Sequence, residues 1–281
     1  MQGADGATMG FSEARAVYIR GAGALYRNTG LLNKAVNTLP RHSIYGCALH
    51  LHARRLYDPS APELTLTRLQ RRASELGGLS PGRVAAHVML LRKLGFLEAR
   101  QADDRRQRIL VPTDKMIGED HRWLMSQLEP LRELELFELS DEERSDIGFA
   151  LSFRASWAVT PAEVRSFVDH HPTFAFFVTR DGGYSMLLEL LQQWLDTGST
   201  EVSFDAAATA SAFCVSKSQI WSLLQAAQAK GLLEAAAPAW KQIQLTERLL
   251  TDFDNWFAEK AAGLAVAARR SRAFLADRRE K

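Results

Sequence analysis

Three arginines within four residues are the part of this sequence best suited to chemistry with an anion. Arg105, Arg106 and Arg108 follow a turn-forming run, Gln101–Asp104, and precede a short apolar segment. Guanidinium groups on a hairpin tip with little apolar surface contribute little to folding but bind polyanions well. The sequence therefore predicts that this hairpin contacts nucleic-acid phosphates.

The segment before the hairpin predicts a helix whose start could reach the edges of bases. Ser80 is a typical N-cap, and Pro81 suits the first helical position. Apolar residues then repeat at helical spacing, at Val84, Val88 and Leu91. A recognition helix presents its N-terminal side chains to the major groove, here Ser80, Arg83 and His87. Arg83 is the strongest candidate for a base contact, because a guanidinium can hydrogen-bond to O6 and N7 of guanine. The alternative is that Arg83 is an ordinary solvated helix residue.

A second, diverged copy of this arrangement lies in the C-terminal half. Residues 65–98 align without a gap on residues 201–234, with polar, apolar and glycine positions matched. The helix start of this copy offers Ser216, Lys217 and Gln219 to phosphates or adenine. Ser216 with Gln219 also fits a capping box that needs no ligand. The second hairpin has no arginine, so whether this copy contacts DNA is left open.

The stretch that begins at Asp104 resembles the MarR family of bacterial transcription regulators. In that family the hairpin is the wing of a winged helix-turn-helix, and a wing arginine enters the minor groove. The resemblance implies that Arg106 is the minor-groove residue and that Asp104 orients the arginine. It covers residues 40–137 directly and residues 175–262 by way of the repeat. Pro112 stands where the family usually has Leu, and it is expected to end the return strand early.

Charge is distributed unevenly along the 281 residues. The net charge is only +2, but residues 41–115 carry +7, residues 116–180 carry −6 and residues 181–281 carry −1. This segregation favours a DNA-facing module in the first of these segments over an enzyme core. The apolar share of 46% is typical of globular proteins, and no apolar run approaches the roughly 18 residues of a membrane helix. We expect a cytoplasmic, nucleoid-associated protein with no membrane partner.

Catalytic and metal chemistry have no supporting pattern. The histidines lack the spacing of metal ligands, and two cysteines are too few for a cysteine-based zinc site. Cys47 and Cys214 are both interpreted as small buried apolar residues. We expect no metal, no cofactor and no enzymatic activity.

Together these patterns predict a mainly α fold: tandem winged helix-turn-helix units with small β-hairpin wings, joined by a helical core that imitates a dimer. An N-terminal helical segment over 1–40 precedes a basic winged helix over 41–115. A helical linker over 116–175 leads to the diverged winged helix over 176–248. The C-terminal helix over 249–281 ends in a basic tail, which is either a helix end or a phosphate-seeking arm.

The predicted function is sequence-specific transcriptional regulation on double-stranded DNA, by a monomeric pseudo-dimer or a homodimer. A small aromatic effector is a further expected partner, because aromatic residues precede each winged helix: Tyr18, Tyr26, Trp157, Phe174, Phe176, Phe177 and Tyr184. The competing class is a winged-helix scaffold, or a replication or chromosome-organisation protein, that binds protein partners or non-specific DNA.

Overall fold

The computed structural model is mainly helical, with small antiparallel sheets, and describes residues 2–101, 107–156, 161–236 and 240–279. The N-terminal half contains α1 (Gln2–Tyr26), α2 (Gly30–Val36), α3 (Leu39–Tyr57), α4 (Leu66–Gly77), α5 (Pro81–Lys93), β1 (Leu97–Gln101), β2 (Arg108–Pro112), α6 (Asp114–Leu128), α7 (Pro130–Glu133), α8 (Asp141–Ser145) and α9 (Ile147–Ser156). The C-terminal half contains α10 (Pro161–His170), α11 (Pro172–Val178), α12 (Gly183–Thr197), β3 (Glu201–Ser203), α13 (Ala206–Phe213), α14 (Lys217–Ala229), β4 (Leu233–Ala235), β5 (Gln242–Leu245) and α15 (Glu247–Arg279).

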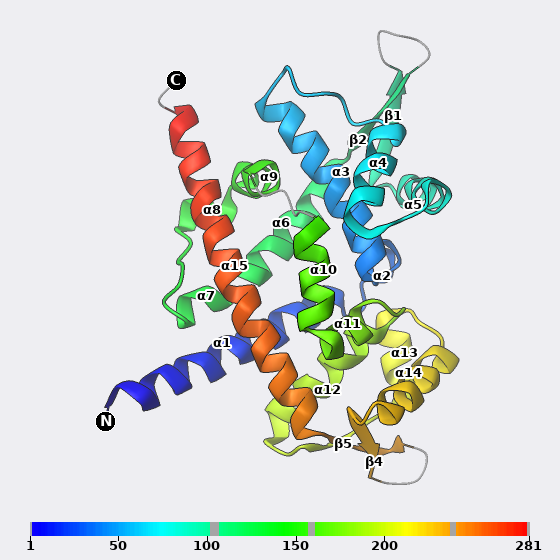
Figure 1. Cartoon of the computed structure of the whole chain (residues 1–281), viewed down its shortest axis with the longest axis vertical. Helices are drawn as coiled ribbons and strands as arrows, with labels where there is room; N and C mark the ends of the chain where they lie inside the picture. Colours follow the sequence, from blue (N-terminus) through cyan, green and yellow to red (C-terminus); the bar gives the residue numbers. More distant parts are fainter. Residues whose placement is uncertain (1, 102–106, 157–160, 237–239, 280–281) are drawn as a thin grey trace.

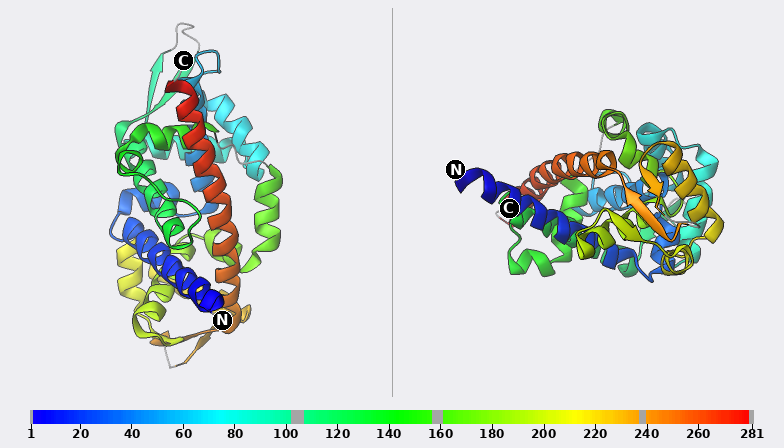
Figure 2. Two further views of the ribbon diagram at one scale, coloured as in Figure 1. Left: turned by 90° about the vertical axis from the view of Figure 1, so that its left-hand side faces the viewer. Right: turned by 90° about the horizontal axis from the view of Figure 1, so that it is seen from below.

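Figures 1 and 2 show an elongated molecule with a β-hairpin at each end. The β1–β2 hairpin lies at one end, and the β4–β5 hairpin lies at the other. Helices α5 and α14 lie on the same side of the molecule, the right of Figure 1, while α15 runs along much of its length in both figures. Two helix–hairpin units thus occupy opposite ends of one helical body. We name α4, α5, β1 and β2 the first unit, and β3, α13, α14, β4 and β5 the second unit.

The first unit is closed by a short antiparallel ladder and by helix caps. Strand β1 pairs with β2 from Leu97 opposite Pro112 to Gln101 opposite Arg108. An isolated bridge joins Thr65 to Ile109 of β2, and the Thr65 side chain also caps α4. These contacts fix the hairpin against the helix pair.

The second unit uses the same devices. Its sheet has the order β3-β5-β4, and Asp205 caps α13. In each unit a threonine after the last strand donates its hydroxyl to a glycine carbonyl: Thr113 to Gly95 and Thr246 to Gly231. Both glycines have positive φ, +75° and +66°, a backbone conformation that residues other than glycine rarely adopt. The two turns from helix to hairpin are therefore built alike.

One hydrophobic cluster connects the two halves. It includes Tyr18 from α1, Leu91 from α5, Leu187 from α12 and Phe253 from α15, all buried. A smaller cluster around Phe153 fixes α9 to α15 and α6. Burial of apolar surface shared by both halves is the main term that stabilises their relative placement.

Two sequence expectations about exposure have different outcomes. Cys47 is buried, as expected, but Cys214 is exposed. Cys214 ends α13 in a left-handed conformation with φ +56°, so its backbone position, and not apolar packing, sets its exposure. Within the described residues, no helix is both long and apolar enough to cross a membrane.

Candidate nucleic-acid interface and central cavity

The first turn of α5 is an exposed, positively charged helix start. The Ser80 hydroxyl accepts a hydrogen bond from the Arg83 backbone N–H at 3.4 Å, and Pro81 occupies the first turn. The Arg83 side chain is exposed. The cap predicted from the sequence is confirmed, and it leaves the guanidinium available to solvent or to a ligand.

His87 does not lie on this exposed face, which corrects the prediction that it reads bases. Its side chain is only 6% exposed because α2 packs against α5 there. Burial lowers the pKa of His87 to about 4, and the charge of Arg41 adds to that effect. Together with Val84, Val88 and Leu91 it forms a run at i, i+3, i+4 and i+7. That run is the signature of a buried helix face and could have identified His87 as a core residue.

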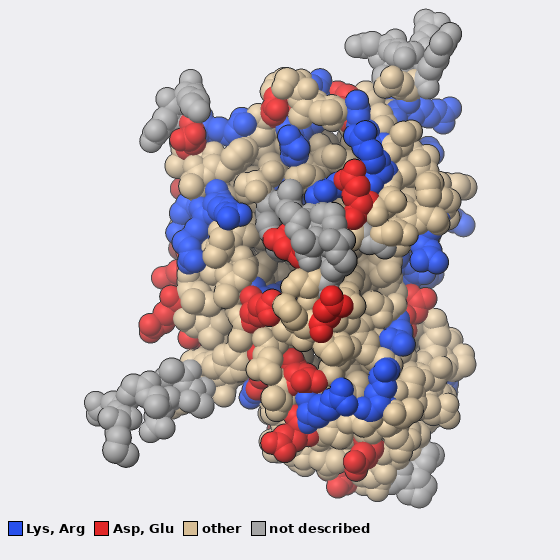
Figure 3. Space-filling view, in the orientation of Figure 1, with Lys and Arg blue, Asp and Glu red and all other residues tan. Residues whose placement is uncertain are grey.

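The hairpin of the first unit carries exposed arginines on both strands. Arg100 and Arg108 are exposed, near the tip ends of β1 and β2. Strand β2 ends at Pro112. The predicted orienting acid Asp104 and the predicted contacts Arg105 and Arg106 lie outside the described residues. Figure 3 shows Lys and Arg gathered around the first unit, with acidic residues more frequent over the middle of this face.

The corresponding surface of the second unit is polar and carries little charge. Ser216 and Gln219 form the predicted capping box: Ser216 Oγ accepts from Gln219 N at 3.1 Å, and Gln219 Oε1 accepts from Ser216 N at 2.9 Å. Lys217 is exposed beside them. Two of the three predicted contacts therefore have a structural role, and Lys217 is the remaining cation of this turn.

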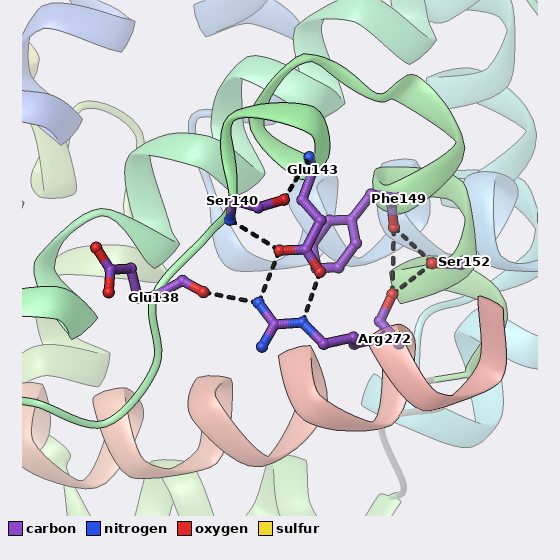
Figure 4. Close-up of polar contacts among 7 residues, drawn as sticks. Glu138, Ser140, Glu143, Phe149, Ser152 and Arg272 are labelled. Carbon is purple, nitrogen blue, oxygen red and sulfur yellow. Dashed lines mark hydrogen bonds and ion pairs between the residues drawn. The ribbon is translucent and has the colours of Figure 1, made fainter. Parts of the chain in front are cut away.

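The basic C-terminal segment is a helix end and not a loose arm. Arg272 donates hydrogen bonds to both carboxylate oxygens of Glu143 and to the Glu138 carbonyl, which attaches α15 to the capping box that Ser140 forms with Glu143 (Figure 4). The neighbouring Ser271 hydrogen-bonds Ser152 in the buried contact with α9. These contacts hold the last turns of α15 against the helical body.

A cavity of about 480 Å³ lies where the two halves meet. Its wall includes residues of α1, α3, α4, α6 and α9 from the N-terminal half and of α10, α11, α12 and α15 from the C-terminal half. Seven aromatic side chains contribute: Tyr18, Tyr26, Trp123, Phe167, Phe174, Tyr184 and Trp256. Most of its lining surface is apolar, and it also contains five charged side chains: Arg72, Arg154, Glu163, Glu259 and Lys260. Its size is typical of small-molecule sites.

The aromatic residues named from the sequence are divided by the structure. Tyr18, Tyr26, Phe174 and Tyr184 line the cavity. Phe176 and Phe177 are buried in the hydrophobic cluster without lining the cavity, and Trp157 lies outside the described residues. The sequence interpretation missed the two tryptophans in the wall. A signal was present, because Trp123 and Trp256 each lie ten positions after Thr113 and Thr246, the threonines that end the two hairpins.

One wall of the cavity contains a buried ion pair. Arg154 binds both carboxylate oxygens of Asp120, at 3.0 and 2.6 Å, and lies 4.6 Å from the centre of the Trp123 ring. His42 packs against the same tryptophan ring. Burial, together with the charges of Arg154 and Lys260, lowers the pKa of His42 to about 3. His42 is therefore neutral at physiological pH.

Another wall contains an amine whose hydrogen-bond partners are neutral. Lys260 donates to the Tyr18 hydroxyl at 2.9 Å and to the Gln127 side-chain oxygen. The Tyr18 hydroxyl also lies 2.5 Å from that of Tyr184. Burial lowers the pKa of Lys260 from 10.5 to about 7. The cavity therefore contains an amine whose protonated form is disfavoured by burial.

Comparisons with known proteins add no relative to this description. The chain matches no protein-family model, no curated protein and no solved structure. Within the described ranges no group of three or more His, Cys, Asp or Glu residues could hold a metal ion.

Proposed function

We propose that this protein is a sequence-specific DNA-binding transcriptional regulator with two winged-helix units in one chain. In this proposal α5 enters the major groove, and the arginine-rich β1–β2 hairpin reaches the minor groove. The second unit supplies a weaker contact through the start of α14. The helical body takes the place of a dimer interface, so one chain covers two half-sites.

The observation that carries the proposal is the placement of the two helix–hairpin units. Helices α5 and α14 lie on one side of the molecule, and the hairpins extend to its two ends (Figures 1 and 2). Two helices on one side can address one face of a duplex, with half-sites a helical turn or its multiples apart. The matched caps and glycine turns of the two units support the same interpretation.

The charge difference between the units supports an asymmetric DNA site. Residues 66–112 contain ten Lys or Arg and four Asp or Glu, whereas residues 201–245 contain three of each. Electrostatic attraction to phosphates supplies most sequence-independent affinity, so the first unit would supply most of it. A palindromic site would require two equal readers, which this chain does not have.

Selection of preferred sequences from a random duplex pool tests the proposal. We expect enrichment of an asymmetric site with one strongly specified half. Affinity for that site, measured by fluorescence anisotropy, should fall steeply as the salt concentration rises from about 50 to 200 mM, as it does for proteins that contact several phosphates.

Two outcomes would contradict the proposal. Enrichment of perfect inverted repeats by a chain that stays monomeric would contradict the proposal that the two units bind DNA unequally. Absence of binding to any duplex at the lower salt concentration would favour the winged-helix scaffold, whose contacts would be with protein partners.

A further inference from the structure

The cavity is lined by residues at equivalent positions of the two halves. Counted from Thr113 and Thr246, Trp123 matches Trp256 and Gln127 matches Lys260. Both tryptophans, Gln127 and Lys260 line the cavity. Helices α6 and α15 therefore present the same face to one shared space.

The aromatic walls repeat this correspondence. His42 and Phe174 each lie two positions after a proline in the first turn of a helix, Pro40 in α3 and Pro172 in α11. His42 packs against Trp123 with ring centroids 5.2 Å apart, and Phe174 stacks on Trp256 at 3.5 Å. Two equivalent ring pairs thus flank the cavity, and flat apolar ligands pack well against such rings.

The equivalence is broken by charge at Gln127 and Lys260. Arg154 is neutralised by Asp120, whereas the carboxylates in the lining are Glu163 and the mostly exposed Glu259, which is hydrogen-bonded to the His171 ring. Lys260 forms hydrogen bonds to Tyr18 and Gln127, and its ammonium lies 4.2 and 4.9 Å from the ring centres of Tyr18 and Trp256. No ion pair from Lys260 to a carboxylate is found among the described residues. A half-buried ammonium without a counter-ion is costly, and a ligand anion would reduce that cost.

We propose that this cavity binds one amphipathic carboxylic acid per chain, with a flat apolar body between the two ring pairs and its carboxylate on Lys260. The cavity volume of about 480 Å³ accommodates a body of two rings. A cationic ligand group is disfavoured next to Lys260, because the ammonium already supplies positive charge there and Arg154 is neutralised by Asp120. A neutral ligand would leave the ammonium uncompensated.

The site has a physical connection to the first unit. Arg72 and Leu76 of α4 contribute to the cavity wall, and α4 packs against α5. The ligand site nevertheless stands independently of the DNA-binding proposal, because its test is a binding measurement in the absence of DNA.

Calorimetric titration with biphenyl-4-carboxylic acid and with biphenyl-4-carboxamide is the test. The two probes share shape and differ in charge. We expect the acid to bind the wild-type chain about tenfold more tightly than the amide, the size of one charge-assisted contact, with one ligand per chain. Lys260→Met should bring the two affinities within about twofold, while Lys34→Met, which removes an exposed lysine of α2, should leave the preference unchanged.

Several results would overturn the proposal. Equal affinities for acid and amide, absence of binding by the acid, or a preference retained in Lys260→Met would each do so. Reductive trapping of biphenyl-4-carboxaldehyde on Lys260, with no binding of the acid, would assign the amine to carbonyl condensation instead. The comparison of acid with amide on the wild-type chain decides the matter even if Lys260→Met fails to fold.

Discussion

The first and second units differ at the positions where their common backbone is exposed. Arg83, Arg100 and Arg108 in the first unit correspond to Gln219, Ala236 and Lys241 in the second. Both units have a serine cap, a glycine turn and a threonine hydroxyl contact, although only the second unit completes a capping box. The comparison separates what the fold needs from what a ligand would need: caps and turns are retained, whereas the arginines are not.

The helical body shows a parallel difference. Asp120 of α6 is buried, with 5% of its side chain exposed, and pairs with Arg154. At the equivalent position of α15 the chain has Phe253, which packs in the hydrophobic cluster. One half therefore uses a buried ion pair where the other uses an aromatic ring, and this difference is open to experiment.

The largest expected effect concerns this ion pair. Asp120→Ala leaves the Arg154 charge buried without a partner and should lower the free energy of unfolding by about 3–5 kcal/mol. Chemical denaturation monitored by circular dichroism measures the change. The double variant Asp120→Leu with Arg154→Met makes this wall apolar, like its counterpart, and should regain most of that stability. A double variant as unstable as Asp120→Ala would show that the pair is needed for more than charge compensation.

The second prediction tests the hairpins. Replacing Arg105, Arg106 and Arg108 together by Ala should weaken DNA binding on the order of 100-fold and reduce the salt dependence by about three phosphate contacts. Lys241→Ala is the matched change in the second hairpin and should have a much smaller effect. Anisotropy titrations at several salt concentrations provide both values. An equal loss of DNA affinity from the changes in the two hairpins would show that the first unit does not supply more of the binding than the second.

The third prediction compares the helix starts. Arg83→Ala should cost about 1–3 kcal/mol of binding to the selected site and relax the preference at one base pair. Gln219→Ala, at the equivalent position, should chiefly reduce stability because Gln219 completes a capping box. Binding to a panel of single-base variants of the site distinguishes the two effects. Unchanged base preference in Arg83→Ala would place this arginine outside the readout.

The fourth prediction concerns Gln127 and Lys260, which occupy equivalent positions. The folded state releases the Lys260 proton near pH 7, whereas the unfolded chain retains it up to about pH 10.4. Stability should therefore rise with pH between these values, since the unfolded state binds the extra proton there. Lys260→Gln should remove this rise and stabilise the chain at pH 6 by about 1–2 kcal/mol. Thermal melts across the pH range measure both effects.

The smallest expected effect compares the two caps. Ser80→Ala and Ser216→Ala should each cost about 1 kcal/mol of unfolding free energy, because each removes the acceptor for a backbone N–H in the first turn. Denaturant titrations of both variants provide the comparison. The capping box predicts the greater loss for Ser216→Ala, and the reverse order would argue against a contribution from Gln219.

Local signals account for most of what the sequence predicts correctly. The Ser80 and Ser216 caps, the first hairpin and the mainly helical character depend on residues a few positions apart. His87 differs from its prediction because its position near the helix start favours exposure, whereas its position in the apolar repeat favours the burial that the structure shows. Cys214 was misassigned because a left-handed helix end is unusual for a residue other than glycine.

The cavity depends on contacts that no local pattern encodes. Lys260 reaches residues 242 and 133 positions away, and Asp120 pairs with a residue 34 positions away. These pairs form only when α1, α6, α9 and α15 pack together. Four cavity aromatics were named from the sequence, but the charged groups beside them were not, since a lone lysine in a helix is usually solvated.

Helix α15 extends without interruption for 33 residues, which corresponds to about 50 Å. Its first turn is tied to the second unit through Arg248, its middle lines the cavity and its last turns are attached to α8 and α9. The length of this one helix therefore fixes the distance between the two ends of the molecule. If both units bind one duplex, as we propose, that length sets the number of base pairs between the two contacts.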